Sequence, residues 1–248
     1  MKFNSKVAAL ALALVSCSVM AADPHAHWSY EGHGGPERWN ELEHDFAGCK
    51  LGRQQSPIDI RGAKKAKLEP IGFHYTAGPA TVVNNGHTVQ VNLTAGGSIT
   101  LPDGEYKLLQ FHFHTPSEEK IDGVASPLVA HFVHRNAAGK LAVVAVLFQA
   151  GGENAALKGV FEHMPAKAEE SAALEGGLDP AAILPARRGY YAYMGSLTTP
   201  PCSEGVRWQV LKQNATVSAA QLATFQKLYS MNARPVQSLN GRTLEVSE

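Results

Sequence analysis

The segment Gln110-Phe111-His112-Phe113-His114-Thr115-Pro116-Ser117-Glu118 predicts a β-strand that carries two histidines on one face. Leucines precede it at 108 and 109, and together with the two phenylalanines they favour extended structure. Side chains of a strand alternate between its two faces. His112 and His114 are therefore expected on one side of this strand, and Phe111 and Phe113 on the other.

A third histidine, His131, lies in a second apolar β-type run at 128–134. It follows His114 by 17 positions, which suits two neighbouring strands joined by a polar turn around Asp122-Gly123. Three neutral imidazoles suit a borderline-soft cation such as zinc, and three protein ligands leave a fourth position open for water, as in catalytic sites. Taken alone, these histidines could also be half-buried strand residues with backbone partners. His134 falls on the opposite strand face and is predicted to be a packing histidine.

Four motifs occur in an order that resembles the α-class carbonic anhydrases, specifically their bacterial secreted branch. They are Gln110-Phe111-His112-Phe113-His114, His131-Phe132-Val133-His134, Asn84-Asn85-Gly86-His87 and Gly195-Ser196-Leu197-Thr198-Thr199-Pro200-Pro201. The resemblance covers nearly the whole chain after residue 27. It implies one domain, 22–248, that is mostly β with a few short helices, around a central, largely antiparallel twisted sheet, with zinc at the floor of a conical cleft.

The resemblance also implies an activity and the residues that carry it. The expected reaction is the zinc-dependent, reversible hydration of carbon dioxide to bicarbonate and a proton, with zinc-bound hydroxide as nucleophile. His112, His114 and His131 match the metal ligands, and His87 matches the proton shuttle. Thr198 and Glu118 match the pair that orients the hydroxide. On residues alone, His87 could be a surface turn histidine, the Thr-Thr-Pro-Pro run a rigid turn, and Glu118 an exposed loop acid. The same hydroxide could also attack activated esters.

Further positions match the substrate pocket and the surroundings of the ligands. Carbon dioxide is small and apolar, so its pocket should be apolar. The residues that match the substrate pocket are Thr199, Val133, Val143, Leu197 and Trp208. Gln110 and Asn240 match residues that hold the ligand histidines from outside, and Tyr30 matches a tyrosine at the rim of the active site.

Val129 is the one departure from the pattern. Two positions before the third ligand, the family usually carries a glutamate that accepts a hydrogen bond from the free nitrogen of that histidine. A valine cannot accept this bond, so His131 is expected to be less well oriented and zinc to be held more loosely, unless a water or carbonyl substitutes. This departure supports an alternative function, a carbonic-anhydrase-like zinc-binding or recognition protein with weakened catalysis.

Composition and the N-terminus bear on partners and location. The chain of 248 residues has 22 basic and 22 acidic side chains, so its charge gives no case for binding nucleic acid. Residues 1–21 are predicted to form a secretory signal, with no transmembrane span, which places the mature chain in the periplasm. Leu14-Val15-Ser16-Cys17 also resembles a lipoprotein cleavage box, but ordinary cleavage near Ala21 is favoured over lipidation of Cys17. The sequence leaves the oligomeric state open between monomer and dimer.

Two cysteines, Cys49 and Cys202, remain after removal of the signal. In an oxidising compartment such a pair favours a disulfide over two free thiols. Cys202 directly follows the Thr198–Pro201 loop, so a bond to Cys49 would pin this loop against the N-terminal part of the fold.

Periodicity predicts the remaining elements. We expect a turn at 84–86 followed by an alternating strand, a hairpin with arms at 99–101 and 106–109, a central strand at 141–148 covered on both faces, and a strand at 208–211. Helices are expected at 155–163, after a cap at Asp179, and from 219 to about 229 behind a capping box at 218–221. Residues 166–177 are expected to be a surface loop.

Overall fold

The computed structural model describes residues 27–248. The expected export signal at 1–21, including Cys17, therefore lies outside the described residues. None of the helices within 27–248 has the length and apolar character needed to cross a membrane.

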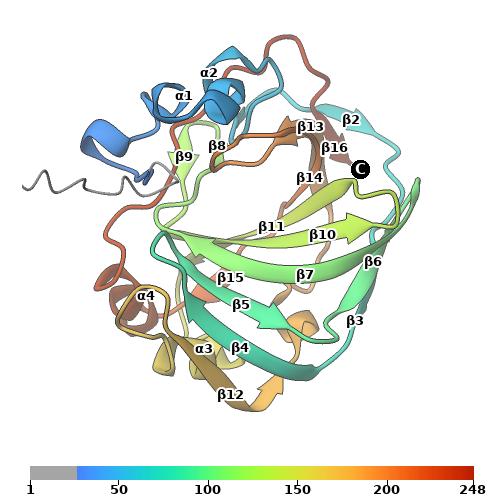
Figure 1. Ribbon diagram of the computed structural model, residues 1–248. Coiled ribbons are helices and arrows are strands. Elements are labelled where there is room, and N and C mark those ends of the chain that lie inside the picture. Colours follow the sequence, from blue (N-terminus) through green and yellow to red (C-terminus); the bar gives the residue numbers. More distant parts are fainter. Residues whose placement is uncertain (1–26) are drawn as a thin grey trace, which may run out of the picture.

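A large twisted sheet, mostly antiparallel, forms the body of the molecule (Figure 1). Its main path runs β12-β4-β5-β7-β10-β11-β14-β13-β16-β2, with β3, β6 and β15 attached to it. The parallel pairs in this sheet are β11–β14, β11–β15 and β16–β2. The strands are β2 (Lys64–Ala66), β3 (Gly72–Tyr75), β4 (Gly78–Asn84), β5 (Val89–Leu93), β6 (Gly97–Leu101), β7 (Gly104–His114), β10 (Leu128–Asn136), β11 (Leu141–Ala150), β12 (Ser171–Leu178), β13 (Tyr190–Ser196), β14 (Glu204–Leu211), β15 (Ala215–Val217) and β16 (Glu245–Ser247).

Short elements surround this sheet. A small sheet joins β1 (Asp59–Ile60), β8 (Lys120–Ile121) and β9 (Val124–Ala125). The helices α1 (Trp39–Leu42) and α2 (Gly48–Leu51) lie together at one end, and α3 (Lys158–Glu162) and α4 (Ala219–Gln226) at another (Figure 1). Single 3-10 turns are η1 (Gly32–Gly34), η2 (His44–Ala47), η3 (Ala155–Leu157) and η4 (Pro180–Ile183). The expected fold class is thus confirmed.

The two faces of β7 and β10 pack into different apolar layers. Phe111, Phe113 and Phe132 are fully buried in the larger layer, which α3 and α4 cover with Phe161 and Phe225. A smaller layer, on the face of the histidines, contains apolar residues of β10, β11 and β14. The strand period of two therefore separates the phenylalanines from the histidines, as the sequence predicts.

Most predicted elements occur, with two corrections. The capping box of α4 has both of its hydrogen bonds, between the side chain of Ser218 and the backbone of Gln221 and in the reverse direction. That helix ends at Gln226, short of the expected end near 229. Residues 166–177 are not all loop, because Ser171–Leu178 forms β12, an edge strand paired with β4. Its small and polar residues suit an exposed edge, where little apolar burial is available to mark a strand in the sequence.

Candidate metal centre and active site

Strands β7 and β10 bring the three predicted ligands together. The two strands are antiparallel neighbours, with His131 paired directly to His112 and Val129 paired to His114. Asp122 and Gly123 adopt positive φ angles at the turn of the β8–β9 hairpin between them. One nitrogen from each of His112, His114 and His131 lies within 4.8 Å of the others, a grouping that could hold a metal ion.

A hydrogen bond fixes the outward nitrogen of each histidine. His112 Nδ1 donates to Gln110 Oε1 at 2.9 Å, and His114 Nδ1 donates to the carbonyl oxygen of Asn232 at 2.7 Å. His131 Nε2 lies 3.0 and 3.2 Å from the carboxylate oxygens of Glu119. Because these partners are acceptors, each ring carries its proton on the outward nitrogen and presents a lone pair inward. The inward atoms are Nε2 of His112, Nε2 of His114 and Nδ1 of His131.

Burial sets the protonation state of the first two ligands. Burial and the nearby charge of His131 lower the pKa of His112 to about 3, and the pKa of His114 lies well below its usual value for the same reasons. Burial acts in the same direction on His131, but Glu119 and Glu118 outweigh it and raise the pKa of His131. Neutral imidazole is the form that binds a metal, so His112 and His114 are prepared for that role.

Two outer partners differ from the sequence prediction. Gln110 contacts His112 as expected, whereas Asn240, expected beside a ligand, is exposed and its amide donates to the carbonyl of Arg53. Asn232 takes that place: besides accepting from His114, its side chain bonds Thr115 N, the carbonyl of Phe113 and the carbonyl of His87. The contact uses a backbone carbonyl, so no side-chain pattern in the sequence marks it.

A carboxylate, rather than a water or a carbonyl, substitutes for the acceptor that position 129 does not provide. Val129 is fully buried in the smaller apolar layer and offers no acceptor. Glu119 supplies the carboxylate instead, from the residue just before β8, and its side chain is completely buried. Glu118 and Glu119 stand side by side in the sequence as two of its many acids, and only the path of the hairpin shows which way each one points.

Glu118 is buried rather than exposed in a loop. Its Oε1 accepts the backbone N–H of Arg234 at 2.8 Å, and its Oε2 lies 3.5 Å from His114 Nε2 and 3.8 Å from His131 Nδ1. Burial raises the pKa of Glu118 to about 7, against the opposing effects of His131, the Arg234 N–H and the hydroxyl of Thr198. Thr198, itself buried, therefore reaches the carboxylate closely enough to favour its ionised form.

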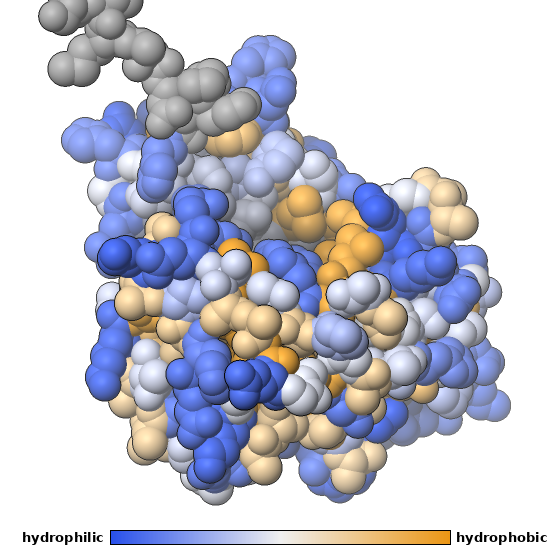
Figure 2. Space-filling view, turned by 60° about the horizontal axis from the view of Figure 1, so that its bottom comes forward, coloured by the Kyte–Doolittle hydropathy of each residue, from blue (hydrophilic) through white to orange (hydrophobic). Residues whose placement is uncertain are grey.

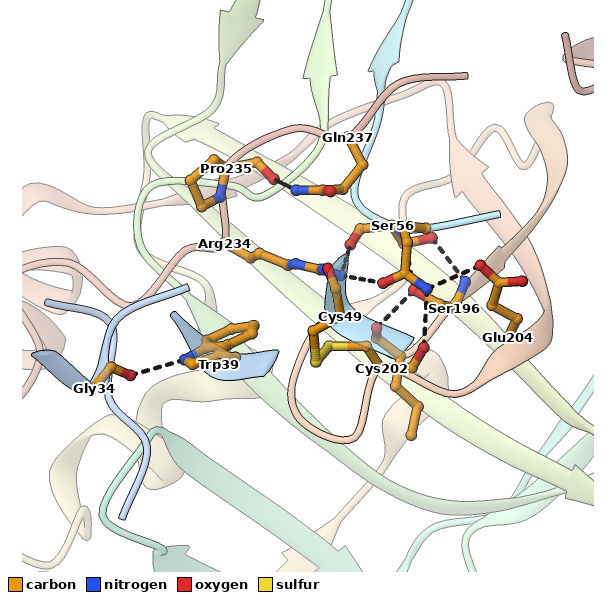
Figure 3. Close-up of a disulfide and its surroundings, with 12 residues drawn as sticks. Gly34, Trp39, Cys49, Ser56, Ser196, Cys202, Glu204, Arg234, Pro235 and Gln237 are labelled. Atoms are coloured by element: carbon orange, nitrogen blue, oxygen red, sulfur yellow. Dashed lines mark hydrogen bonds between the residues drawn. A yellow bond between two sulfur atoms is a disulfide. The ribbon is translucent and has the colours of Figure 1, made fainter. Parts of the chain in front are cut away.

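The expected disulfide joins Cys49 to Cys202, the residue that follows the Thr198–Pro201 loop (Figure 3). Cys49 in α2 is bonded to Cys202, whose N–H donates to the carbonyl of Thr199 at 2.8 Å. Gln55 Nε2 donates to the carbonyl of Cys202 at 3.0 Å. The buried guanidinium of Arg234 donates to Gln55 Oε1 and to the carbonyl of Cys49. The loop that carries Thr198 and the backbone that holds Glu118 are thus tied to the same buried group.

His87 lies at the end of a row of aromatic rings. Its imidazole stacks on Trp28 with ring centroids 3.6 Å apart, Trp28 meets Tyr30 edge to face at 5.5 Å, and Tyr30 lies 6.5 Å from His114. The side chain of Asn85 caps the backbone N–H groups of His87 and Thr88. Burial, and to a smaller extent the charge of His27, lowers the pKa of His87 to about 4.

The apolar residues assigned to the substrate pocket lie side by side across three strands. Val133 of β10 pairs with Val143 of β11, and Val143 pairs with Trp208 of β14. Trp208 packs edge to face on His131 at 4.9 Å, and Leu197 packs against the same layer. Seen from one side, the surface of the molecule is hollowed, and hydrophobic and hydrophilic residues meet at the hollow (Figure 2).

Comparison with known proteins agrees with this geometry. The family model "eukaryotic-type carbonic anhydrase" matches residues 34–248. The chain belongs to the α-carbonic anhydrase family. It is 46% identical over 242 residues to a carbonic anhydrase of Klebsiella pneumoniae, with 96% of this chain and 97% of that protein covered, and 43% identical over 236 residues to one of Pectobacterium carotovorum, with 95% and 97% covered.

Solved structures of bacterial members share the fold. The α-carbonic anhydrase of Thermovibrio ammonificans, solved with the inhibitor sulfanilamide, superposes with a TM-score of 0.86 at 44% identity, covering 90% of this chain and 99% of that one. The enzyme from Photobacterium profundum gives 0.84 at 45% identity, covering 90% and 100%. Family membership makes this chain an enzyme of the carbonic anhydrase type, and α-carbonic anhydrases are zinc enzymes that act on carbon dioxide and bicarbonate.

Proposed function

We propose that this chain is an exported zinc carbonic anhydrase that hydrates carbon dioxide reversibly to bicarbonate and a proton. The observation that carries the proposal is the convergence of three imidazoles, each with one nitrogen held by an acceptor and the other directed inward. Such a set of three neutral nitrogen donors is typical of a catalytic zinc site with one open position.

The residues present fit a bound cation. His114 Nε2 is buried and, among the described residues, has no hydrogen-bond partner. An unsatisfied buried polar atom typically costs about 1–3 kcal/mol, and a metal ion at the point of convergence removes this cost. When bound, zinc lowers the pKa of a water molecule toward neutrality and so supplies a hydroxide nucleophile, a property for which carbonic anhydrases are the standard example.

Thr198 and Glu118 direct the nucleophile. Ionised Glu118 accepts a hydrogen bond from the hydroxyl of Thr198, and the N–H of Arg234 donates to Oε1 of that carboxylate. Thr198 Oγ1 is then left with lone pairs only, so it accepts a hydrogen bond from the attacking group rather than donating one. Its hydrogen bond therefore aims the nucleophilic lone pair at the substrate, and Thr199, the next residue of the same loop, is assigned to the substrate pocket.

The remaining residues bind substrate and remove the proton. Val133, Val143, Leu197 and Trp208 offer carbon dioxide a surface without competing polar groups. His87 carries the released proton to solvent, because imidazole is the side chain that titrates nearest neutrality. In the stacked position its pKa of about 4 favours release of the proton to water. We expect it to accept the proton when the ring leaves Trp28 and becomes hydrated.

Residues 1–21 are proposed to direct export and 22–248 to form the catalytic domain in the periplasm, with ordinary cleavage favoured over lipidation at Cys17. The alternative of a recognition protein with weakened catalysis depended on a missing carboxylate beside His131. Glu119 supplies that carboxylate, so the alternative loses its support.

The test is reconstitution of the metal-free, oxidised mature protein with zinc, measuring bound metal and carbon dioxide hydration in the same samples. We expect hydration to rise in proportion to bound zinc and to saturate at one zinc per chain. Full zinc binding without hydration would contradict the proposed enzyme and favour a binding protein.

A further inference from the structure

The third ligand, His131, lies between two buried carboxylates with different surroundings. Glu118 faces the Nδ1 edge of the ring at 3.8 Å, and Glu119 faces the Nε2 edge at 3.0 Å. Glu118 also interacts with two other groups, because it accepts hydrogen bonds from the backbone N–H of Arg234 and from the hydroxyl of Thr198. The hydrogen-bond partner that the structure gives to Glu119 is His131 Nε2, which lies within reach of both carboxylate oxygens.

The backbone around Glu119 is fixed on both sides. The hydroxyl of Ser117 donates to the carbonyl of Glu119 at 2.7 Å and accepts the N–H of Ser126 at 2.8 Å. The N–H of Lys120 donates to the carbonyl of Ile58 in the neighbouring strand. Glu119 is therefore held at the root of the β8–β9 hairpin, and its side chain points back to the strand that carries His131.

Position 129 shows why this carboxylate matters. Residues 129 and 131 are two apart on β10 and lie on the same face, so a glutamate at 129 could reach His131 along its own strand. Val129 fills that place with an apolar side chain in the layer that contains Leu147 and Trp208. The apolar layer thus extends to position 129, and the carboxylate that bonds His131 Nε2 comes instead from the hairpin.

We propose that Glu119 is the positioning residue for His131, and that it replaces a carboxylate absent from position 129. By accepting a hydrogen bond from Nε2–H, Glu119 holds His131 in the tautomer whose Nδ1 lone pair points toward His112 and His114. A charged acceptor also makes the imidazole a stronger donor to the metal, and loss of such a partner typically costs about 10–100-fold in metal affinity or activity. The inference rests on the proposed zinc site but does not require that the chain turn over carbon dioxide.

The test measures the rate at which zinc leaves the folded holoprotein in excess chelator. Glu119→Ala should release zinc about 10–100-fold faster than the unaltered protein. Glu119→Gln keeps the size of the side chain and one acceptor oxygen, so it should fall between the two. The double variant E119A/V129E returns a carboxylate to the face of His131 and should restore slow release. Glu105→Ala, which removes an acid of β7 bonded to Ser98, is the control and should leave the rate unchanged.

A second measurement separates positioning from damage to the fold. In nitrogen-15-labelled holoprotein, the Nε2 proton of His131 should be visible as a slowly exchanging resonance in the unaltered protein, in Glu119→Gln and in E119A/V129E, and should be lost in Glu119→Ala. Zinc release from Glu119→Ala at the original rate would overturn the proposal. Fast release that V129E does not slow would also overturn it, because the effect would then come from the altered hairpin. Zinc bound with these kinetics but without hydration would refute the proposed function alone.

Discussion

The ligand histidines and the groups that orient them come from two different kinds of structure. His112, His114 and His131 lie on adjacent regular strands, where pairing and alternation fix their positions. Glu118, Glu119, Thr198 and Asn232 lie in irregular segments, held by individual hydrogen bonds rather than by strand pairing, and by the disulfide. The sheet thus places the ligands, and the loops decide which nitrogen each ligand presents and where the nucleophile points. Variants of the three strand histidines should abolish zinc binding, and variants of the loop residues should reduce zinc affinity or activity without abolishing it.

The largest effect is expected for His112→Ala, which removes one of the three inward nitrogens. Zinc should no longer bind stoichiometrically. Hydration should fall by more than about 100-fold, the upper end of the typical cost of losing a residue that only orients a ligand. Metal analysis and stopped-flow hydration would show both. His134→Ala is the matched control, because His134 lies on the same strand as His131 but bonds Tyr75 and the carbonyl of Ala142. Stoichiometric zinc and full activity in His112→Ala would refute the assignment.

Glu118→Gln tests the loop that aims the nucleophile. A glutamine oxygen can still accept from the N–H of Arg234, but its amide would donate to Thr198 and reverse the sense of that hydrogen bond. We expect zinc content to be unchanged and kcat/KM to fall by about 10–100-fold. An unaltered kcat/KM in steady-state hydration would show that the pair has no role in the reaction.

Replacing both cysteines, C49S/C202S, tests whether the disulfide holds the loop. The bond joins residues 153 positions apart, and loss of a native disulfide of this kind typically removes about 2–5 kcal/mol of unfolding free energy, which denaturant titration would measure. Activity should fall more than zinc content does, since Thr198 lies in the loop that leads to Cys202, whereas the ligands lie on strands. Equal loss of zinc and activity would contradict the division between strands and loops.

The smallest effect is expected for Trp28→Ala, which removes the ring stacked on His87. Because burial is the main cause of the low pKa, the pKa of His87 should rise from about 4 toward its ordinary 6.5, as followed by NMR titration of the ring. Without the substitution, His87 has a pKa of about 4 in the folded state and of about 6.5 in the unfolded state. Between these two pH values the unfolded state binds more protons than the folded state, so the free energy of unfolding falls as the pH falls from 6.5 to 4. Trp28→Ala should reduce this pH dependence. A pKa that stays near 4 would contradict the role of stacking.

The same division explains what the sequence could predict. Alternation in β7 and β10 indicates the three histidines, the packing role of His134 and the separation of the phenylalanines, because strand geometry has a fixed period. The roles of Glu118, Thr198 and His87 come from ordered motifs rather than from periodicity. Asn232 and Glu119 escaped prediction for physical reasons: one acts through its backbone carbonyl, and the other depends on the direction of a hairpin that no local pattern encodes. Resemblance alone points to Asn240 instead of Asn232, because both asparagines lie in a segment without regular structure, where no periodicity distinguishes positions eight residues apart.

The most direct test of the account is the position of zinc in crystals of the oxidised mature protein, located by anomalous scattering at the zinc edge. The account predicts one peak about 2.0–2.1 Å from His112 Nε2, His114 Nε2 and His131 Nδ1, with Glu119 still hydrogen-bonded to His131 Nε2. A peak elsewhere, or zinc bound to His131 Nε2 or to the Glu119 carboxylate itself, would contradict it.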